Sequence, residues 1–293
     1  MKRVDNYIKA YKFYQSRLNT PGLSREDAEA LLLDKEREKE EHEQYRIVER
    51  IVSHREAGES VEYFCKWSGL NYENCTWETQ DEIRAIAKEQ IEAYRTREAE
   101  ARFPFKSVGY PRNQRPPFQK INKDPEYVVT TGGVLKDFQL TGLNWLAYLW
   151  SKGENGILAD EMGLGKVRLF TFLSCNALIG SMQTVQTVAF LSYLFHELHQ
   201  YGPFLVIVPL STITAWQTQF QAWAPDLNVI TYIGTASARE VIRSFEFGPS
   251  NKKLKLNVLL TTYELTLRDS KELGDIKWQA LAVDEVHLNC VLS

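Results

Sequence analysis

The sequence is poor in cysteine, and the few cysteines it has form neither a metal-site pattern nor a disulfide framework. They lack the paired short spacings that zinc sites require, and four thiols in 293 residues are too sparse for a disulfide-stapled secreted scaffold. This usage suits a reducing compartment. Small buried thiols are what we expect of Cys65 and Cys75. The four cysteines are Cys65, Cys75, Cys175 and Cys290.

An excess of charge of either sign is also absent, because 35 Lys and Arg residues nearly balance 38 Asp and Glu residues to give a net charge of −3. Any contact with nucleic acid must therefore come from a local patch of basic residues. The charged N-terminus shows no secretory signal.

A membrane-spanning run is missing as well, although residues 169–195 contain no charged side chain. That stretch is long enough to cross a bilayer. Polar residues interrupt it, however, and it lacks the basic and aromatic flanks of a span. We therefore expect no membrane segment. The composition, 44% hydrophobic and 25% charged, is that of an ordinary globular protein of about two domains.

Residues 1–42 predict a helical linker. Ser24–Asp27 has the form of a capping box and is followed by apolar residues at helical spacing. Asp34–Glu41 alternates charges at i,i+4 distances, which is typical of a solvated helix. The segment is either an arm that binds a partner or a simple spacer.

Residues 43–100 predict a small curved sheet closed by one C-terminal helix. Alternating side chains favour strands over Tyr45–Val52 and Val61–Trp67, and a third short strand at Thr76–Glu78. Thr79 and Glu82 then have the spacing of a helix cap. The apolar residues expected on one face of that helix are Ile83, Ile86, Ile91 and Tyr94.

The motifs Tyr-x-Ile-Val-Glu-Arg-Ile, Tyr-x-x-Lys-Trp-x-Gly-Leu and Cys-Thr-Trp-Glu, in this order, resemble a chromodomain. Chromodomains that read methyl-lysine surround the quaternary ammonium with aromatic rings, which is cation–π recognition. The resemblance places Tyr45, Trp67 and Leu70 at the cage positions, so the third position lacks a ring. Alternatively, Tyr45 and Trp67 simply pack on a hydrophobic surface. Trp77 matches the structural tryptophan of the family.

Residues 101–130 predict an extended linker, because five prolines fall within them and prevent a continuous helix. Basic residues are interspersed with the prolines. The segment is either a plain linker or a modest basic surface that touches DNA or the next domain.

Residues 131–293 predict an α/β lobe with a doubly wound parallel sheet. Short apolar runs read as buried strands with helical stretches between them. These runs are Ile157–Ala159, Phe204–Val208, Val258–Leu260 and Leu281–Val283.

The first of these runs leads into a glycine-rich turn that ends in lysine, the layout of a phosphate-binding loop. Gly163, Leu164 and Gly165 would present backbone N–H groups to a triphosphate, and Lys166 would place a point charge on its β- and γ-phosphates. The last run ends in Asp284-Glu285. Strand-terminal acids are what a Mg²⁺–nucleotide site requires, with Asp284 on the metal and Glu285 polarising the attacking water.

Together with Leu135–Leu146, Pro209–Thr212 and Leu260–Glu264, these motifs resemble the first ATPase lobe of the Snf2 family, superfamily-2 motors that translocate on DNA. A chromodomain upstream narrows the resemblance to the chromodomain–helicase–DNA-binding (CHD) remodellers, most similar to their first subfamily. The resemblance implies that Gln139 reads the adenine. It also implies DNA-backbone contacts for a set of hydroxyl residues, each of which could instead be a strand or cap residue. These are Ser211, Thr212, Thr261 and Thr262.

The chain departs from the family pattern immediately after the lysine. Snf2 proteins continue Gly-x-Gly-Lys-Thr-Val-Gln-Thr, but here Val167 follows Lys166, and the continuation appears only at Thr184–Thr187. Residues 167–183 therefore look like an insertion, either real or from an unremoved intron. Valine cannot bind Mg²⁺. In addition, the family's Asp-Glu-Ala-His reads Asp-Glu-Val-His, the basic residues expected after it are missing, and the second lobe with its arginine fingers would lie beyond Ser293.

The sequence thus predicts the N-terminal part of an ATP-dependent nucleosome remodeller that couples ATP binding and hydrolysis to DNA translocation. ATP and Mg²⁺ are the implied cofactors. DNA, nucleosomes and a histone H3 tail are the implied partners, in the nucleus. We expect the chain as given to be defective in hydrolysis. The alternatives are an inert chromatin-binding or scaffold fragment and an unrelated P-loop enzyme.

Overall fold

The computed structural model describes residues 46–58, 60–99, 110, 114–158, 181–247 and 254–284, without the side chains of residues 181–183. The chain divides into two compact units, one ending at Glu92 and the other beginning at Ala93, and each is considered by itself. The helical linker predicted for residues 1–42 lies outside the described residues.

The first unit contains an antiparallel sheet in the order β1-β2-β3, as the alternation predicted. Register shifts in the β1–β2 ladder accompany its curvature. Burial raises the pKa of the Cys65 thiol in β2 to about 12, with smaller contributions from Glu78 and Cys75. Cys65 is thus the small buried thiol that was expected, whereas Cys75 is only partly buried. The strands are β1 (Val48–Ala57), β2 (Ser60–Trp67) and β3 (Thr76–Thr79), with a 3-10 turn, η1, at Tyr72–Asn74.

Two helices, not one, follow this sheet. The helix α3 (Gln80–Ile86) ends where Ala87 leaves helical geometry, and α4 (Lys88–Ala99) begins after it. The break takes Ile86 off the expected apolar face, and this side chain is 62% exposed. The other three predicted core residues of this stretch are buried. Thr79 contacts Glu82 through its side chain at 2.8 Å and does not cap the helix backbone.

The second unit is organised around a parallel sheet in the order β5-β6-β4-β7. Three of the predicted strands are confirmed. Continuous burial explains the apolar runs of β4 and β6, whereas in β7 Leu281 is exposed and Ala282 is buried. Strand β5 was missed by the sequence reading, although its Val-Ile-Thr-Tyr sequence is typical of a strand. The strands are β4 (Phe204–Ile207), β5 (Val229–Tyr232), β6 (Val258–Thr261) and β7 (Ala280–Val283).

The strand predicted before the phosphate loop is not formed by Ile157 and Leu158, and Ala159 lies outside the described residues. Gly156 explains the course of this segment. A Cβ atom there would lie 2.3 Å from Leu149 and 2.8 Å from Trp145, so the backbone runs closely against the preceding helix. Ile157 is 43% exposed. The prediction of a buried strand is therefore wrong for these two residues.

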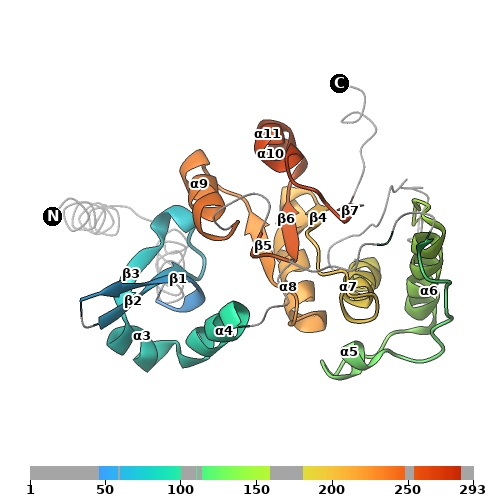
Figure 1. Ribbon diagram of the computed structural model, residues 1–293, viewed down its shortest axis with the longest axis horizontal. Helices are drawn as coiled ribbons and strands as arrows, with labels where there is room; N and C mark the ends of the chain where they lie inside the picture. Colours follow the sequence, from blue (N-terminus) through green and yellow to red (C-terminus); the bar gives the residue numbers. More distant parts are fainter. Residues whose placement is uncertain are drawn as a thin grey trace, which may run out of the picture. The chain divides into compact units, whose positions relative to one another are not determined.

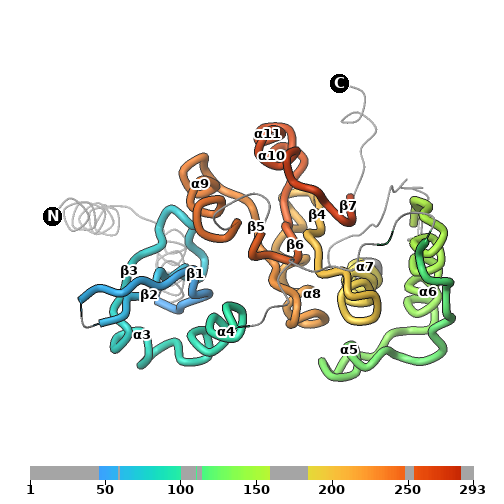
Figure 2. The backbone as a smooth tube through the Cα atoms, in the orientation of Figure 1, coloured from blue at the N-terminus to red at the C-terminus, as the bar shows by residue number. Residues whose placement is uncertain are grey.

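Helix α6 (Asp137–Lys152) packs against α7 (Ser181–His196), which in turn packs against α8 (Ile213–Trp223), as Figure 1 shows. The Cα path in Figure 2 can be followed from β6 through two short helices into β7. No helix in the described parts of the chain is long and apolar enough to cross a membrane. The remaining helices are α5 (Glu126–Val129), η3 (Leu210–Thr212), α9 (Ala236–Phe245), α10 (Tyr263–Arg268) and α11 (Ser270–Gly274).

Of the proline-rich linker predicted over residues 101–130, the structure describes residue 110 and residues 114–130. This part contains no α-helix up to Pro125 and then forms the short helix α5 (Glu126–Val129), and it is fastened to α6. The amide of Asn144 exchanges two hydrogen bonds of 2.8 Å with the backbone of Ile121. Arg115 lies over the Trp150 ring at 4.6 Å and donates to the Trp150 carbonyl oxygen at 2.6 Å. The segment was expected to be a plain linker or a basic surface that touches DNA or the next domain. Arg115 makes a contact of the last kind, with Trp150 in α6.

Candidate functional site

Three predicted site segments that are far apart in the sequence meet at one edge of the parallel sheet. The turns that follow β6, β4 and β7 carry Thr262, Ser211 and Asp284, and these three strands are neighbours in the sheet. Backbone hydrogen bonds link their ends, from Val208 N–H to Thr261 oxygen at 2.9 Å and from Asp284 N–H to Ile207 oxygen at 2.8 Å. The carboxyl edge of a parallel sheet is where ligands bind in such folds.

Asp284 directly follows β7 and is the one of the two predicted strand-terminal acids that the structure describes; it is 1% exposed. The indole Nε1–H of Trp216, in α8, donates to Asp284 Oδ2 at 3.0 Å. The hydroxyl of Tyr263, at the start of α10, donates to the Asp284 carbonyl oxygen. The orientation of Asp284 is thus set by two side chains that the sequence reading did not select. A separation of 68 residues hides the Trp216 contact from any local pattern.

Of the four hydroxyl residues predicted to lie along DNA, Ser211 is exposed and the other three are buried. Thr212 donates to the Pro209 carbonyl at 3.1 Å, and Thr262 accepts from Leu265 N–H as the N-cap of α10. Thr261 is fully buried and donates to the Tyr232 carbonyl at 2.9 Å. The Thr261 hydroxyl thus closes a contact between neighbouring strands, and the DNA contact expected of Thr261 stays a prediction.

Gln139 lies in the first turn of α6 and is 5% exposed. Its amide oxygen accepts the Lys136 N–H at 2.9 Å, which fixes the side chain beside the helix start. The helix is held against α7 close by, because a Cβ atom on Gly142 would lie 2.3 Å from Gln186 Nε2. Thr184–Thr187, the displaced family motif, is thus part of the α6–α7 interface, and all four residues are buried.

Several predicted site residues lie outside the described residues. They include the phosphate-loop residues, the acid that follows Asp284, one residue of the aromatic cage, and most of the predicted insertion. The last three residues of that insertion begin α7. The predicted site residues that are not described are Gly163, Leu164, Gly165, Lys166, Glu285 and Tyr45.

The donor set fits a nucleotide-bound Mg²⁺ only in part. Asp284 supplies a carboxylate of the kind that Mg²⁺ prefers, at the sheet edge where it is needed. The position after Lys166 holds Val167, whose side chain has no oxygen. One of the two protein groups expected at the metal is therefore chemically unable to bind it.

In the first unit, Trp67 is half-buried and its indole N–H donates to Thr76 Oγ1 at 2.9 Å. Trp77 has a packing role, because its ring stacks on Phe64 at 4.9 Å and lies under the Arg55 guanidinium at 4.3 Å.

A buried charge cluster that the sequence reading missed joins α9, β5 and the start of α11. Arg239 donates to both carboxylate oxygens of Asp269, at 2.6 and 3.2 Å, and the Tyr232 hydroxyl donates to the same carboxylate at 2.5 Å. Burial raises the pKa of Tyr232 to about 12, with a further contribution from Asp269. The cluster fixes the turns at this end of the sheet, and no local motif marks its members.

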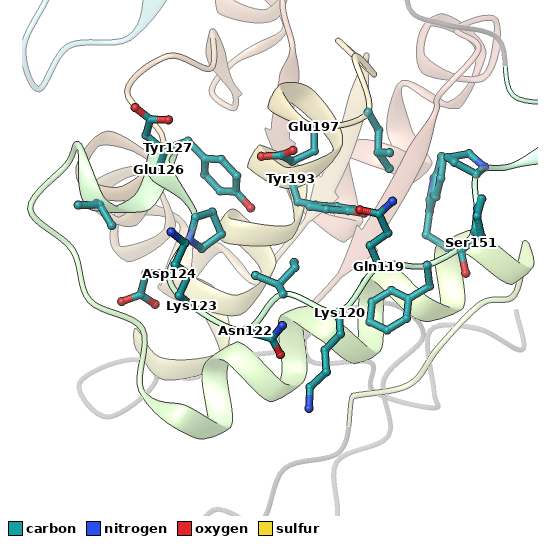
Figure 3. A pocket seen from close by; sticks show the side chains of 18 residues that line it. Gln119, Lys120, Asn122, Lys123, Asp124, Glu126, Tyr127, Ser151, Tyr193 and Glu197 are labelled. Carbon is teal, nitrogen blue, oxygen red and sulfur yellow. The ribbon is translucent and has the colours of Figure 1, made fainter.

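A pocket of about 980 Å³ lies between residues 116–125, α5 and the C-terminal ends of α6 and α7. Figure 3 shows Tyr127, Tyr193 and Glu197 together at one end and Lys120 at the other. Burial raises the pKa of the Tyr127 hydroxyl, and the Glu197 charge adds to the effect. The chain continues from the end of α7 to the amino end of β4, so the pocket is at the edge opposite Asp284. Neither Gln139 nor the four hydroxyl residues predicted to contact DNA line it, whereas Lys120 and Lys123 of the basic linker do.

These features define a P-loop-type α/β lobe that follows a small antiparallel sheet domain in the same chain. Two family models match it: the Chromo (chromatin organisation modifier) domain over residues 46–97 and the SNF2-related domain over residues 138–288. Curated relatives include Chromodomain-helicase-DNA-binding protein 1 from Gallus gallus, 42% identical over 98% of this chain, and Protein CHROMATIN REMODELING 5 from Arabidopsis thaliana, 39% identical over 98%. The chain spans 16% of the length of each of these two relatives.

The SWI2/SNF2 ATPase core of Sulfolobus solfataricus, solved in complex with double-stranded DNA, is 29% identical, with a TM-score of 0.41 over 57% of this chain and 28% of that one. The family models and the sequence identities are sufficient: the chain belongs to the chromodomain-containing, Snf2-type CHD remodeller family.

Proposed function

We propose that this chain supplies the chromodomain and the first ATPase lobe of a remodeller that couples ATP binding and hydrolysis to movement along nucleosomal DNA. The observation that carries the proposal is the meeting of Asp284 with the turns of Ser211 and Thr262 at one sheet edge, in a chain of the CHD family. Such a juxtaposition would let one lobe hold a nucleotide and a DNA strand together. The proposed setting is the nucleus, and the proposed partners are DNA, nucleosomes and a histone H3 tail.

In this proposal the backbone of Gly163–Gly165 and the Lys166 ammonium hold the phosphates, and Gln139 contacts the adenine. Bound Mg²⁺ would neutralise the phosphate charge that develops during transfer. Asp284 would hold the metal, and Glu285 would orient the attacking water. Ser211 would contact the DNA backbone, with Thr212 and Thr262 shaping the turns through their hydrogen bonds. Tyr45 and Trp67 would flank the ammonium of a methylated lysine.

The first prediction is that the 293-residue polypeptide binds ATP weakly and hydrolyses it at a negligible rate with or without DNA. Val167 cannot replace the metal-binding hydroxyl, and an arginine finger, worth about 10³–10⁵ in rate in related NTPases, is not expected within these residues. Removal of residues 167–183 joins Thr184 to Lys166 and should tighten binding of a fluorescent ATP analogue by about tenfold or more, without restoring turnover.

The control is the same deletion with Lys166→Ala, which should not gain affinity. ATP turnover by the intact chain at rates typical of motors would overturn the assignment of a defective pocket. The second candidate, an inert chromatin-binding or scaffold fragment, is favoured by the missing oxygen at Val167. It predicts that the deletion leaves nucleotide affinity unchanged.

A further inference from the structure

Asp284 is held by side chains from the two elements that follow the DNA-facing turns. Trp216 lies in α8, which continues directly from η3 with its exposed Ser211. Tyr263 is the residue immediately after Thr262. The indole donates to the carboxylate of Asp284, and the tyrosine hydroxyl donates to its carbonyl oxygen. A residue from the helix after each turn therefore contacts a different part of the same acidic residue.

The contact with Trp216 is suited to transmit a displacement. Trp216 and Asp284 are each 1% exposed, so water does not readily replace the lost bond if they separate. The indole is a rigid ring with one N–H donor, and hydrogen bonds weaken steeply once their geometry departs from linear. A small shift of α8 must therefore either carry the Asp284 carboxylate with it or break a bond of 3.0 Å in a dry interior.

We propose that Trp216 and Tyr263 are positioning residues that couple occupancy of the DNA-facing turns to the orientation of Asp284. The proposal rests on the proposed function, because it takes DNA as the ligand of those turns and Asp284 as the metal-holding acid. A coupling of this kind is reciprocal, so the state of the Asp284 carboxylate also biases DNA affinity. A purely structural Trp216 would instead stabilise the lobe without any response to DNA.

The test is a nuclear magnetic resonance titration of the ¹⁵N-labelled chain with a short blunt DNA duplex, with affinity measured in parallel by fluorescence anisotropy. The expected result is that the duplex shifts both the Trp216 indole resonance and the Asp284 backbone amide resonance. In Trp216→Phe, the shift of the Asp284 amide should fall by about half or more while the duplex still binds, because Trp216 is buried and does not itself contact DNA.

Trp223→Phe is the matched control, because Trp223 ends the same helix and packs over Gly133, at a different part of the lobe surface. It should leave the Asp284 response intact. Tyr263→Phe removes a single oxygen and should reduce the same response, which keeps the test decisive if Trp216→Phe fails to fold.

The outcomes separate the two proposals. A duplex that binds without shifting the Asp284 amide, or a shift that survives both Trp216→Phe and Tyr263→Phe, overturns the coupling and leaves the proposed function standing. Absence of duplex binding by anisotropy overturns the DNA contact of this lobe, and the coupling falls with it.

Discussion

Asp269 and Asp284 are both buried aspartates near the carboxyl edge of the same sheet, but they are held by different kinds of donor. Asp269 accepts from the guanidiniums of Arg239 and Arg243 and from the Tyr232 hydroxyl. Asp284 accepts from the neutral indole of Trp216. A carboxylate between two guanidiniums has its charge neutralised within the fold. The indole N–H of Trp216 orients the carboxylate without itself adding a positive charge, which would suit the metal-holding role proposed for Asp284.

The largest expected effect tests the structural side of this comparison. Asp269→Asn leaves the Arg239 guanidinium, 4% exposed, without its charge partner, and breaking a buried pair in this way costs about 3–5 kcal/mol. The free energy of unfolding should fall by that amount in urea denaturation. Asp284→Asn is the matched comparison. Its amide oxygen can still accept from Trp216, so the loss should be smaller than in Asp269→Asn.

Both changes remove one carboxylate charge at a buried position. Equal losses in the free energy of unfolding would therefore mean that the arginine partners of Asp269 do not make it the more important of the two for stability. A greater loss in Asp284→Asn would reverse that order and make Asp284 the structural acid.

The next effect concerns pH. Burial alone would raise the pKa of Asp269, but hydrogen bonds from Arg239 and Tyr232, together with the arginine charges, outweigh it and lower the pKa below its ordinary value of 3.8. The unfolded chain therefore takes up this proton at a higher pH than the folded chain. The contribution of Asp269 to stability is complete above the unfolded pKa and is lost as the pH falls through that value toward the folded pKa.

Urea midpoints measured from about pH 5 to about pH 3 should thus fall more steeply in the wild-type chain than in Asp269→Asn, which has no proton to take up at this site. Parallel slopes in the two proteins would show that the pKa of Asp269 is not depressed. Asp284→Asn, measured under the same conditions, shows whether the effect is specific to the arginine-bound acid.

The sequence was sufficient to select Asp284 as a candidate metal ligand. It was not sufficient to identify Trp216 and Tyr263, the residues that contact Asp284 in the structure. Strand-terminal acids form a local pattern that follows from a parallel sheet. The contacts of Trp216 and Arg239 join residues 68 and 30 positions away, and nothing in a local window encodes them. Buried runs such as Phe204–Ile207 were equally accessible, because burial on both faces requires continuous apolar sequence.

Where prediction failed, packing against a neighbour decided the local structure. Gly156 packs closely against α6, and the next two residues, Ile157 and Leu158, form no strand of the sheet. Ala87 interrupts a helix that apolar periodicity alone would continue, and Ile86 is exposed as a result.

The smallest expected effect isolates burial from geometry. Arg55 contacts Glu62 in the chromodomain at 2.6 Å, the same distance as Arg239 to Asp269, but the side chains are 52% and 23% exposed instead of 4% and 10%. Exposed pairs gain little because water screens the charges, so Glu62→Gln should cost about 1 kcal/mol or less in urea denaturation. Added salt should shrink even that difference, whereas the loss in Asp269→Asn should persist. If Glu62→Gln proved as damaging as Asp269→Asn, distance and not burial would govern the strength of these ion pairs, and the role assigned to Asp269 would lose its basis.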